Sequence, residues 1–286
     1  GERECSIQRR SQKLIEESPS VAVSPETRKR LGAAAVAIVK EASYANAGTV
    51  EFLMDRDGNF YFIEVNARLQ VEHPVTEFVT GLDLIAEQLR IAAGEPLGLS
   101  QDDVRLNGWS IECRITAEDA ETGFMPSLGR IDLVNEPSGP GVRVDSSLFN
   151  GCEVSQYYDS LLSKLIVWGK DRTQALQRLR RALSEYEVFG VKTTLPFHHR
   201  LIDDPRFVAG EIDTHFLDRS FDMTEPGHGS SIDEALLATA LLAHNRRRNG
   251  SAPAGATPSR ANGWRTAGRI QATSRKAGGG SWRSIF

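Results

Sequence analysis

The chain has 286 residues, of which 40% are hydrophobic and 25% are charged, and its net charge is −4. This composition is typical of a globular protein that buries a sizeable core and holds more than one structural unit. No apolar run of about 18 residues is found, which argues against a transmembrane helix and against a membrane as a partner.

Charge is distributed unevenly along the chain. The tail from Arg246 onward carries nine basic residues and no acidic residue, so the rest of the chain carries about −13, which is −4 less +9. An acidic body argues against nucleic acid as a partner, because phosphate contacts need a basic surface. The tail is rich in Gly, Ser, Ala and Pro, and we interpret it as a flexible linker.

The chain begins with Gly1 instead of Met, and its start is interpreted as a cut through a longer protein. Its three cysteines, Cys5, Cys113 and Cys152, have no metal-type spacing and are predicted to be free thiols. Free thiols are typical of a reducing compartment. We therefore expect a cytoplasmic protein, with the mitochondrial matrix as the alternative.

The first predicted elements are a helix and a hairpin. Ser24 and Pro25 supply an N-cap and a first-turn proline before an apolar stripe at helical spacing, which predicts a helix. Residues 50–54 and 60–65 are short apolar and aromatic runs on either side of Asp57-Gly58. That dipeptide is typical of a two-residue hairpin turn, so the two runs are predicted to pair as antiparallel strands.

The rest of the chain mixes helices with short strands. Helices are predicted for residues 82–93 and, from an amphipathic pattern, for residues 172–189. A capping box at Ser231 predicts a last helix up to residue 243. The sequence therefore predicts an α+β fold. The β-like segments between the helices are residues 109–116, 129–134, 142–144 and 162–168.

Two glutamates of the predicted hairpin are candidates for a metal site. With Asp57 and Gly58 as the turn residues, counting back along both strands places Glu51 directly opposite Glu64. Like charges in that position destabilise a sheet, so the pair calls for a cation. Oxygen ligands from the two glutamates and from Asn66 suit Mg²⁺, which typically binds one or two carboxylates together with substrate phosphates. Two solvated glutamates on an exposed face are the alternative, and spacing alone does not decide.

The segment that follows is unusually polar on one side. If the chain stays extended, Glu64, Asn66, Arg68, Gln70 and Glu72 all project to the same face. A guanidinium, an amide and a carboxylate beside a metal pair could hold a small planar oxyanion and move a proton on it. A solvated strand edge is the alternative interpretation.

These motifs resemble those of the biotin carboxylases of the ATP-grasp superfamily. The resemblance is carried by GERECSIQRRSQK at residues 1–13 and EFLMDRDGNFYFIEVNARLQVEHPVTE at residues 51–77. It continues through IECRITAED, GPGVRVDS, YYDSLLSKLIVWG, VKTTLPFHHRL and DTHFLD to about residue 220. It implies the C-terminal half of an ATP-grasp domain at residues 1–104, a mixed α+β biotin carboxylase C-terminal domain at residues 105–220, and a helix with a basic linker at residues 221–286.

The resemblance also implies roles for individual residues. Glu72 is implied to be the general base that deprotonates bicarbonate, with Arg68 beside it, and Arg114 is implied to stabilise the biotin enolate. From the residues alone, the alternative for Arg114 is a structural ion pair with Asp159 or Glu118. Ser11 departs from the family, since many relatives carry histidine there. The implied metal ligands are Glu51, Glu64 and Asn66, the implied bicarbonate contacts are Lys13, Arg68, Gln70 and Val71, and the implied nucleotide contacts are Gln8, Ser11, Leu53 and Ile63.

The implied activity is a ligase reaction in which ATP and bicarbonate form carboxyphosphate and biotin on a carrier domain is carboxylated, with Mg²⁺ or Mn²⁺ as the metal. The expected setting is an acetyl- or propionyl-CoA carboxylase, with a biotin carboxyl carrier domain and a carboxyltransferase subunit as partners and a homo-oligomeric full-length protein. Pyruvate or urea carboxylase is one alternative, and an inactive truncated chain is another. Carbamoyl-phosphate synthetase also phosphorylates bicarbonate, but the ECRITAED segment argues against it. No glycine-rich lid or phosphate-binding lysine pair precedes Glu2, so this chain by itself is expected to be inactive.

Overall fold

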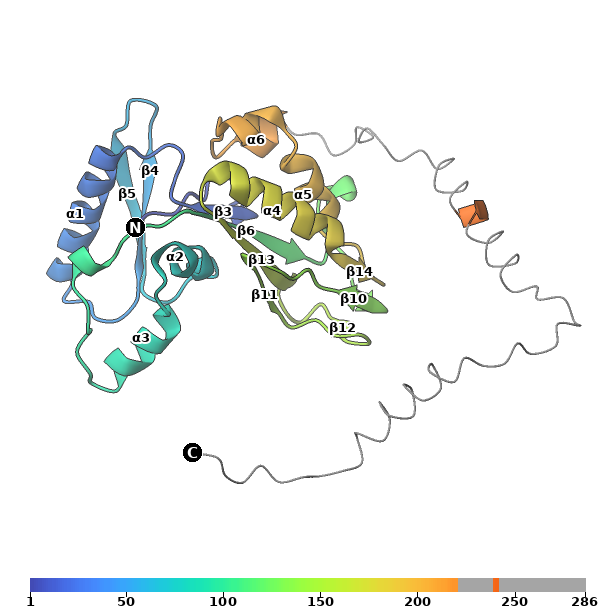
Figure 1. The fold of residues 1–286 in the computed structure, drawn as a ribbon, viewed down its shortest axis with the longest axis horizontal. Helices are drawn as coiled ribbons and strands as arrows, with labels where there is room; N and C mark the ends of the chain where they lie inside the picture. The colour runs from blue at the N-terminus through green and yellow to red at the C-terminus, as the bar shows by residue number, and fades with distance from the viewer. Residues whose placement is uncertain (221–238, 242–286) are drawn as a thin grey trace, which may run out of the picture. The chain divides into compact units, whose positions relative to one another are not determined.

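A four-stranded antiparallel sheet organises the chain in the computed structural model, which describes residues 1–220 and 239–241 (Figure 1). Its strand order is β11 (Val142–Ser146), β13 (Leu161–Gly169), β6 (Trp109–Thr116) and β3 (Ile15–Ser18). Strand β3 thus comes from the first predicted domain and pairs with β6 of the second. The domain boundary predicted near residue 104 stays a prediction, and the pairing of β3 with β6 joins residues from both sides of it in one sheet.

One face of this sheet carries the hydrophobic core. Strand β6 alternates apolar and polar residues, and its apolar members Ile111, Cys113 and Ile115 are fully buried. They join the core cluster formed with helices α4 (Arg172–Glu185) and α5 (Leu195–Leu201), which lie over this face (Figure 1). Burial of each such side chain contributes about 1.5–3 kcal/mol, so this face holds the sheet and its helices together.

The other face is polar and is nevertheless covered. Helix α2 (His73–Thr80) packs against β6, β13 and β3 and buries Val75 and Val79. The polar members of β6 on this side include Ser110 and Glu112, and both are fully buried. A strand that alternates apolar and polar residues usually has one solvated face, so the cover by α2 is a tertiary feature that the alternation does not predict.

The predicted hairpin is formed by β4 (Thr49–Met54) and β5 (Phe60–Asn66). Helix α1 (Pro25–Glu41) lies beside it (Figure 1), and the guanidinium of Arg30 lies 5.1 Å from the centre of the Phe60 ring. The N-cap prediction is confirmed, because the Ser24 hydroxyl accepts a hydrogen bond from the Thr27 amide. None of the side chains of α1 is buried.

Several predicted elements differ in their limits. The helix predicted for residues 82–93 spans α3 (Leu84–Ala92), after Asp83 as its N-cap. The helix predicted for residues 172–189 ends at Glu185, because the chain then enters β14, which pairs with β10. The segment 129–134 divides into β9 and β10, which belong to two different sheets. The remaining elements are β1 (Gln8–Arg9), β2 (Gln12–Lys13), η1 (Gln101–Asp103), β7 (Glu118–Asp119), η2 (Ala120–Thr122), β8 (Met125–Pro126), β9 (Gly129–Arg130), β10 (Leu133–Asn135), β12 (Glu153–Val154), β14 (Glu187–Phe189), α6 (Pro205–Ala209) and α7 (Phe216–Ser220).

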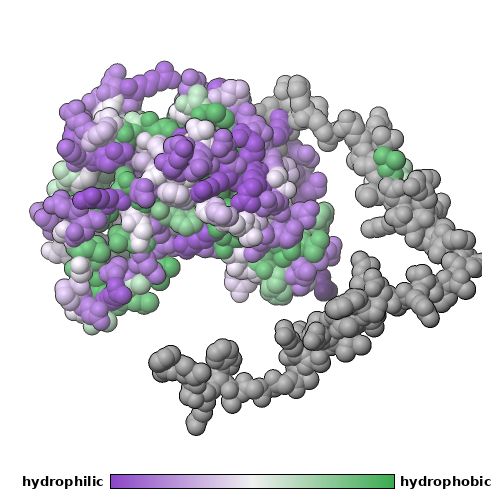
Figure 2. All heavy atoms as spheres, viewed as in Figure 1, coloured by the Kyte–Doolittle hydropathy of each residue, from purple (hydrophilic) through white to green (hydrophobic). Residues whose placement is uncertain are grey.

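The surface in this view is largely hydrophilic with several hydrophobic patches, one of which lies around α3 (Figure 2). Ile85, Leu89 and Leu97 are exposed there. Among residues 1–220 and 239–241, no helix has the length and apolar character needed to cross a membrane. The helix predicted from Ser231 lies outside the described residues except for 239–241, and the predicted basic tail lies outside them entirely.

Candidate functional site

Glu51 and Glu64 face each other in the β4–β5 ladder, as predicted. The two-residue turn assumed in predicting this pairing was wrong. The turn spans five residues, 55–59, because Met54 pairs with Phe60, and the register would then be one residue out. An irregularity in β5 at Ile63, between the pairs Phe52–Phe62 and Glu51–Glu64, restores it. A bulge of one extra residue has this effect on pairing.

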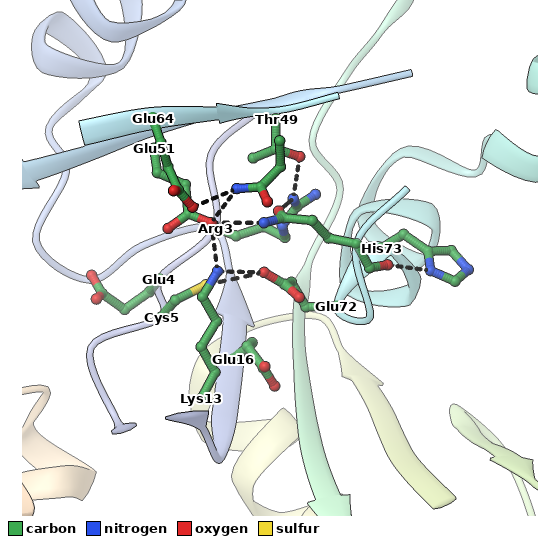
Figure 3. A network of polar contacts seen from close by, with 12 residues as sticks. Arg3, Glu4, Cys5, Lys13, Glu16, Thr49, Glu51, Glu64, Glu72 and His73 are labelled. Atoms are coloured by element: carbon green, nitrogen blue, oxygen red, sulfur yellow. Dashed lines mark hydrogen bonds and ion pairs between the residues drawn. The ribbon is translucent and has the colours of Figure 1, made fainter. Parts of the chain in front are cut away.

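The two glutamates are surrounded by hydrogen-bond donors. The Asn66 amide Nδ2 donates to Oε1 of Glu51 at 3.1 Å and to Oε1 of Glu64 at 2.9 Å. Lys13 Nζ also lies 2.9 Å from Oε1 of Glu51 (Figure 3). These contacts offset the repulsion between the two carboxylates. Two carboxylates on one sheet face suit a hard divalent cation whose other ligands are phosphate or water oxygens. The Asn66 amide presents its NH₂ to them, while its Oδ1 accepts a hydrogen bond from Arg68. In the described part of the chain, no group of three or more His, Cys, Asp or Glu residues could hold a metal, so such a cation would need those other ligands.

The polar segment after β5 does not stay extended. The strand ends at Asn66, and Glu72 becomes the N-cap residue of α2. Arg68 is exposed and donates to the Asn66 side chain and the Leu69 carbonyl, whereas Gln70 and Glu72 are buried. The prediction of one continuous polar face is therefore wrong, because the chain turns toward the sheet. The structure gives no contact between Arg68 and Glu72 within the described residues.

Glu72 lies instead between two other cations. Its Oε1 is 2.7 Å from Lys13 Nζ (Figure 3). Its Oε2 is 3.0 Å from Nη2 of Arg114. Burial alone would raise the pKa of Glu72, but the hydrogen bond and charge of Lys13 outweigh it and lower the pKa. Cys5 Sγ lies 3.9 Å from the same carboxylate, and burial raises the pKa of this thiol well above its usual value. Glu72 is thus an ionised carboxylate beside a neutral thiol.

Lys13 and Arg114 are each shared between two carboxylates. Burial opposes the charge of Lys13, but the carboxylates of Glu72 and Glu51 raise its pKa overall. Arg114 Nε donates to Glu16 at 2.7 Å in addition to the contact with Glu72. Burial likewise opposes the charge of Arg114, and the two glutamates raise its pKa.

The predicted structural partners of Arg114 are not its partners. Glu118 accepts hydrogen bonds from the hydroxyls of Thr116 and Ser160, and Asp159 accepts one from the Leu161 amide. The partner Glu16 lies on β3, about one hundred residues away in sequence. No local pattern links the two, which is why the sequence did not indicate this ion pair.

Arg3 is a site residue that the sequence analysis missed. Its guanidinium donates to Thr49 on β4 at 2.8 Å, to Thr76 on α2 at 3.1 Å and to Gln70 Oε1 at 2.6 Å. With its oxygen held by Arg3, the Gln70 amide directs Nε2 to Glu51 at 2.7 Å. The only signal in the sequence for a role of Arg3 was its position within the family-like segment GERECSIQRR.

The predicted nucleotide contacts lie in two places. Gln8 pairs with Lys13 in the β1–β2 ladder, and Ser11 lies in the intervening turn with a φ of 65°. Leu53 and Ile63 lie on the β4–β5 hairpin and are about half exposed.

Val71, a predicted bicarbonate contact, accepts a hydrogen bond from Lys164 Nζ on its backbone carbonyl at 3.1 Å. The roles of Val71 and of the predicted nucleotide contacts toward ligands stay predictions.

Two family models match the chain, and together they include the site residues described above. Residues 112–219 match the family model described as the biotin carboxylase C-terminal domain. Residues 1–100 match the model of the carbamoyl-phosphate synthase L chain, ATP binding domain. The chain belongs to the biotin carboxylase family. It has the mixed α+β fold of the C-terminal portion of a biotin carboxylase module, and similar solved structures include a biotin carboxylase domain and a biotin carboxylase subunit.

Several biotin carboxylase relatives are closely similar. The biotin carboxylase of Nostoc sp. is 54% identical over 217 residues, which cover 76% of this chain and 48% of the relative. The mitochondrial propionyl-CoA carboxylase alpha chain of Homo sapiens is 51% identical over 229 residues, which cover 79% of this chain and 32% of the relative. A solved structure of the biotin carboxylase domain of 2-oxoglutarate carboxylase from Hydrogenobacter thermophilus contains MgADP, ADP and bicarbonate. It has a TM-score of 0.75 at 51% identity, and the match covers 76% of this chain and 48% of that one. The chain spans about half the length of the first of these relatives.

Proposed function

We propose that a protein carrying this chain carboxylates biotin with ATP and bicarbonate, and that the chain provides the bicarbonate, metal and biotin side of that site. The observation that carries the proposal is the buried Glu72 carboxylate between Lys13 and Arg114. Relatives named biotin carboxylase support it, as does the solved domain that contains MgADP and bicarbonate.

Glu72 is the proposed general base for bicarbonate. A base must be ionised before it accepts a proton, and the lowered pKa keeps Glu72 ionised at neutral pH. The Lys13 ammonium, 2.7 Å away, is placed to attract an anion to the same point. Gln70 contributes an amide that Arg3 holds in one orientation. Val71 and the exposed Arg68 complete the proposed bicarbonate contacts.

Glu51, Glu64 and Asn66 are the proposed holders of Mg²⁺ or Mn²⁺. When bound, the metal would neutralise charge on the transferring phosphates. Lys13 contacts both Glu51 and Glu72, and it therefore links the metal-binding part of the site to the proposed base. Gln8, Ser11, Leu53 and Ile63 remain the proposed contacts of the nucleotide.

Arg114 is the proposed stabiliser of the biotin enolate. An anion that develops during the reaction is stabilised best by a cation that is already fixed in place. The side chain of Arg114 is held by Glu16 and Glu72, and its backbone carbonyl accepts hydrogen bonds from Thr194 and His198. This number of contacts limits the reorganisation needed when charge develops.

For the final acceptor we propose an acyl-CoA, with a biotin carboxyl carrier domain and a carboxyltransferase subunit as partners in a homo-oligomeric assembly. Propionyl-CoA carboxylase alpha chains of several mammals support this acceptor. A pyruvate carboxylase subunit at 54% identity and a 2-oxoglutarate carboxylase subunit at 48% support the alternative of an oxoacid. Assays with the assembled carboxylase, given acetyl-CoA, propionyl-CoA, pyruvate or 2-oxoglutarate, decide between them.

The test of the proposed activity uses a hybrid enzyme. This chain replaces the 217-residue segment of the Nostoc biotin carboxylase to which it aligns. We expect the hybrid to cleave ATP in a reaction that depends on bicarbonate and is stimulated by free biotin. The 286-residue chain by itself, assayed in the same way, is expected to be inactive. A folded hybrid without such turnover, while the unaltered Nostoc enzyme is active, would overturn the proposal.

A further inference from the structure

Two buried glutamates lie directly opposite each other beneath helix α2. Glu16 of β3 pairs with Glu112 of β6 in the antiparallel ladder, and both side chains are fully buried. Opposed residues in such a ladder have Cβ atoms about 4.5–5.5 Å apart and project to the same face. The two carboxyl groups are therefore close neighbours in a region that water does not reach.

The hydrogen bonds made by Glu16 and Glu112 are too few to stabilise two ionised carboxylates. Glu16 Oε1 accepts the hydrogen bond from Arg114. Neither Oε2 of Glu16 nor either oxygen of Glu112 has a hydrogen-bond partner among the described residues. A buried ionised carboxylate without a partner is very unfavourable, so such a group takes up a proton instead. A proton on Glu112 turns it into a donor, and the free Oε2 of Glu16 is the acceptor on the opposite strand.

The surrounding charges place the proton on Glu112. Arg114 lies against Glu16 and favours its ionised form, whereas no cation forms an ion pair with Glu112 in the described part of the chain. Burial, together with the charge of Glu16, raises the pKa of Glu112 well above its usual value. Burial also raises the pKa of Glu16, although Arg114 opposes that rise. The other charged or titratable groups that interact electrostatically with the pair are Glu72 at the start of α2, Lys13 of β2, Lys164 of β13 and the thiols of Cys5 and Cys113.

We propose that Glu112 is a protonated carboxylic acid that shares its proton with Glu16, and that Glu16, fixed by this hydrogen bond, is a positioning residue for the Arg114 guanidinium. The second half of this inference depends on the proposed role of Arg114, and the first half does not. Without the proton, Glu16 would face a second negative charge and its hold on Arg114 would weaken. With it, one carboxylate of the pair remains ionised and directed at Arg114.

Infrared spectroscopy of the full 286-residue chain tests the proton. We expect a protonated carboxyl C=O stretch at pH 7 that disappears in Glu112→Gln. The matched control is Glu17→Gln, the neighbouring buried glutamate of β3, whose carboxylate accepts hydrogen bonds from Arg172 and Trp109. This control should keep the band. No band in the unaltered chain, or a band that survives in Glu112→Gln, would overturn the inference.

A second variant keeps the spectroscopic test decisive if Glu112→Gln does not fold. In Glu16→Gln the proton stays on Glu112 but meets an amide oxygen in place of a carboxylate. The band should therefore persist and shift. A band unchanged in position would mean that Glu16 is not the acceptor.

The positioning role is tested in the Nostoc hybrid. Glu16→Gln should lower the rate of biotin carboxylation about tenfold more than it lowers biotin-independent ATP cleavage, which corresponds to about 1.4 kcal/mol of transition-state stabilisation. Glu16→Asp, which keeps the charge, should recover part of that rate. Equal losses in both reactions, or no recovery with aspartate, would reject the positioning role. An unaltered hybrid without biotin carboxylation would count against the proposed function and leave the infrared result to decide the proton.

Discussion

Replacing Glu72 by glutamine removes the negative charge that lies between Lys13 and Arg114. The carboxylate is 2% exposed and accepts one charge-assisted hydrogen bond on each oxygen. Glutamine keeps the shape but presents an amide NH₂ to one of the two cations. At least one hydrogen bond to a charged group is therefore lost, at a cost of about 1.5–3 kcal/mol.

This loss of stability should be limited, because each cation keeps another carboxylate. Lys13 retains Glu51, and Arg114 retains Glu16. Breaking a buried ion pair outright would cost about 3–5 kcal/mol, so the variant falls below that range. The catalytic loss should be larger, since a positioned general base contributes about 10²–10⁴-fold.

We therefore expect Glu72→Gln to lower bicarbonate-dependent ATP cleavage in the Nostoc hybrid by at least about a hundredfold while the protein stays folded. Thermal unfolding gives the stability, and ADP release gives the rate. Glu17→Gln is the matched control, because it also removes a buried charge that accepts hydrogen bonds from an arginine. A Glu72→Gln rate close to that of the unaltered hybrid, or an equal loss in the control, would refute the general-base assignment.

Three further outcomes are expected. Arg114→Met should impair biotin carboxylation far more than biotin-independent ATP cleavage, and equal losses in the two assays would point to a purely structural role. Glu51→Gln should weaken Mg²⁺ binding in calorimetric titrations of the hybrid with ADP, whereas Glu87→Gln on α3, whose carboxylate pairs with Arg90, should not. Burial lowers the pKa of His198 to about 4, so stability should fall by about 3 kcal/mol as the pH drops from about 6.5 to 4, when the unfolded chain binds the proton more readily. His198→Gln should flatten that dependence in acid-unfolding measurements, and a surface control, His215→Gln, should leave it unchanged.

The sequence determined the elements whose signals are local. The Ser24 cap and helix α1, the β-like segment that forms β6 and the amphipathic helix α4 depend on neighbouring residues and were predicted, although α4 ends at Glu185 instead of residue 189. The facing pair Glu51–Glu64 was also predicted, although a longer turn and a bulge replaced the assumed two-residue turn. The family motifs pointed to Lys13, Gln70, Glu72 and Arg114 as candidate site residues.

The contacts of those residues depend on how distant segments of the chain pack together. The alternation of β6 is compatible with a solvated polar face, and the packing of α2 over that face is what buries Glu112. Strand β3, from far earlier in the chain, brings Glu16 to Arg114, and the first residues bring Arg3 to Gln70. Pattern within one strand fixes which side a residue faces, but it carries no information on what covers that side. That depends on contacts between segments distant in sequence, where the burial of charge is settled by the partners available in three dimensions.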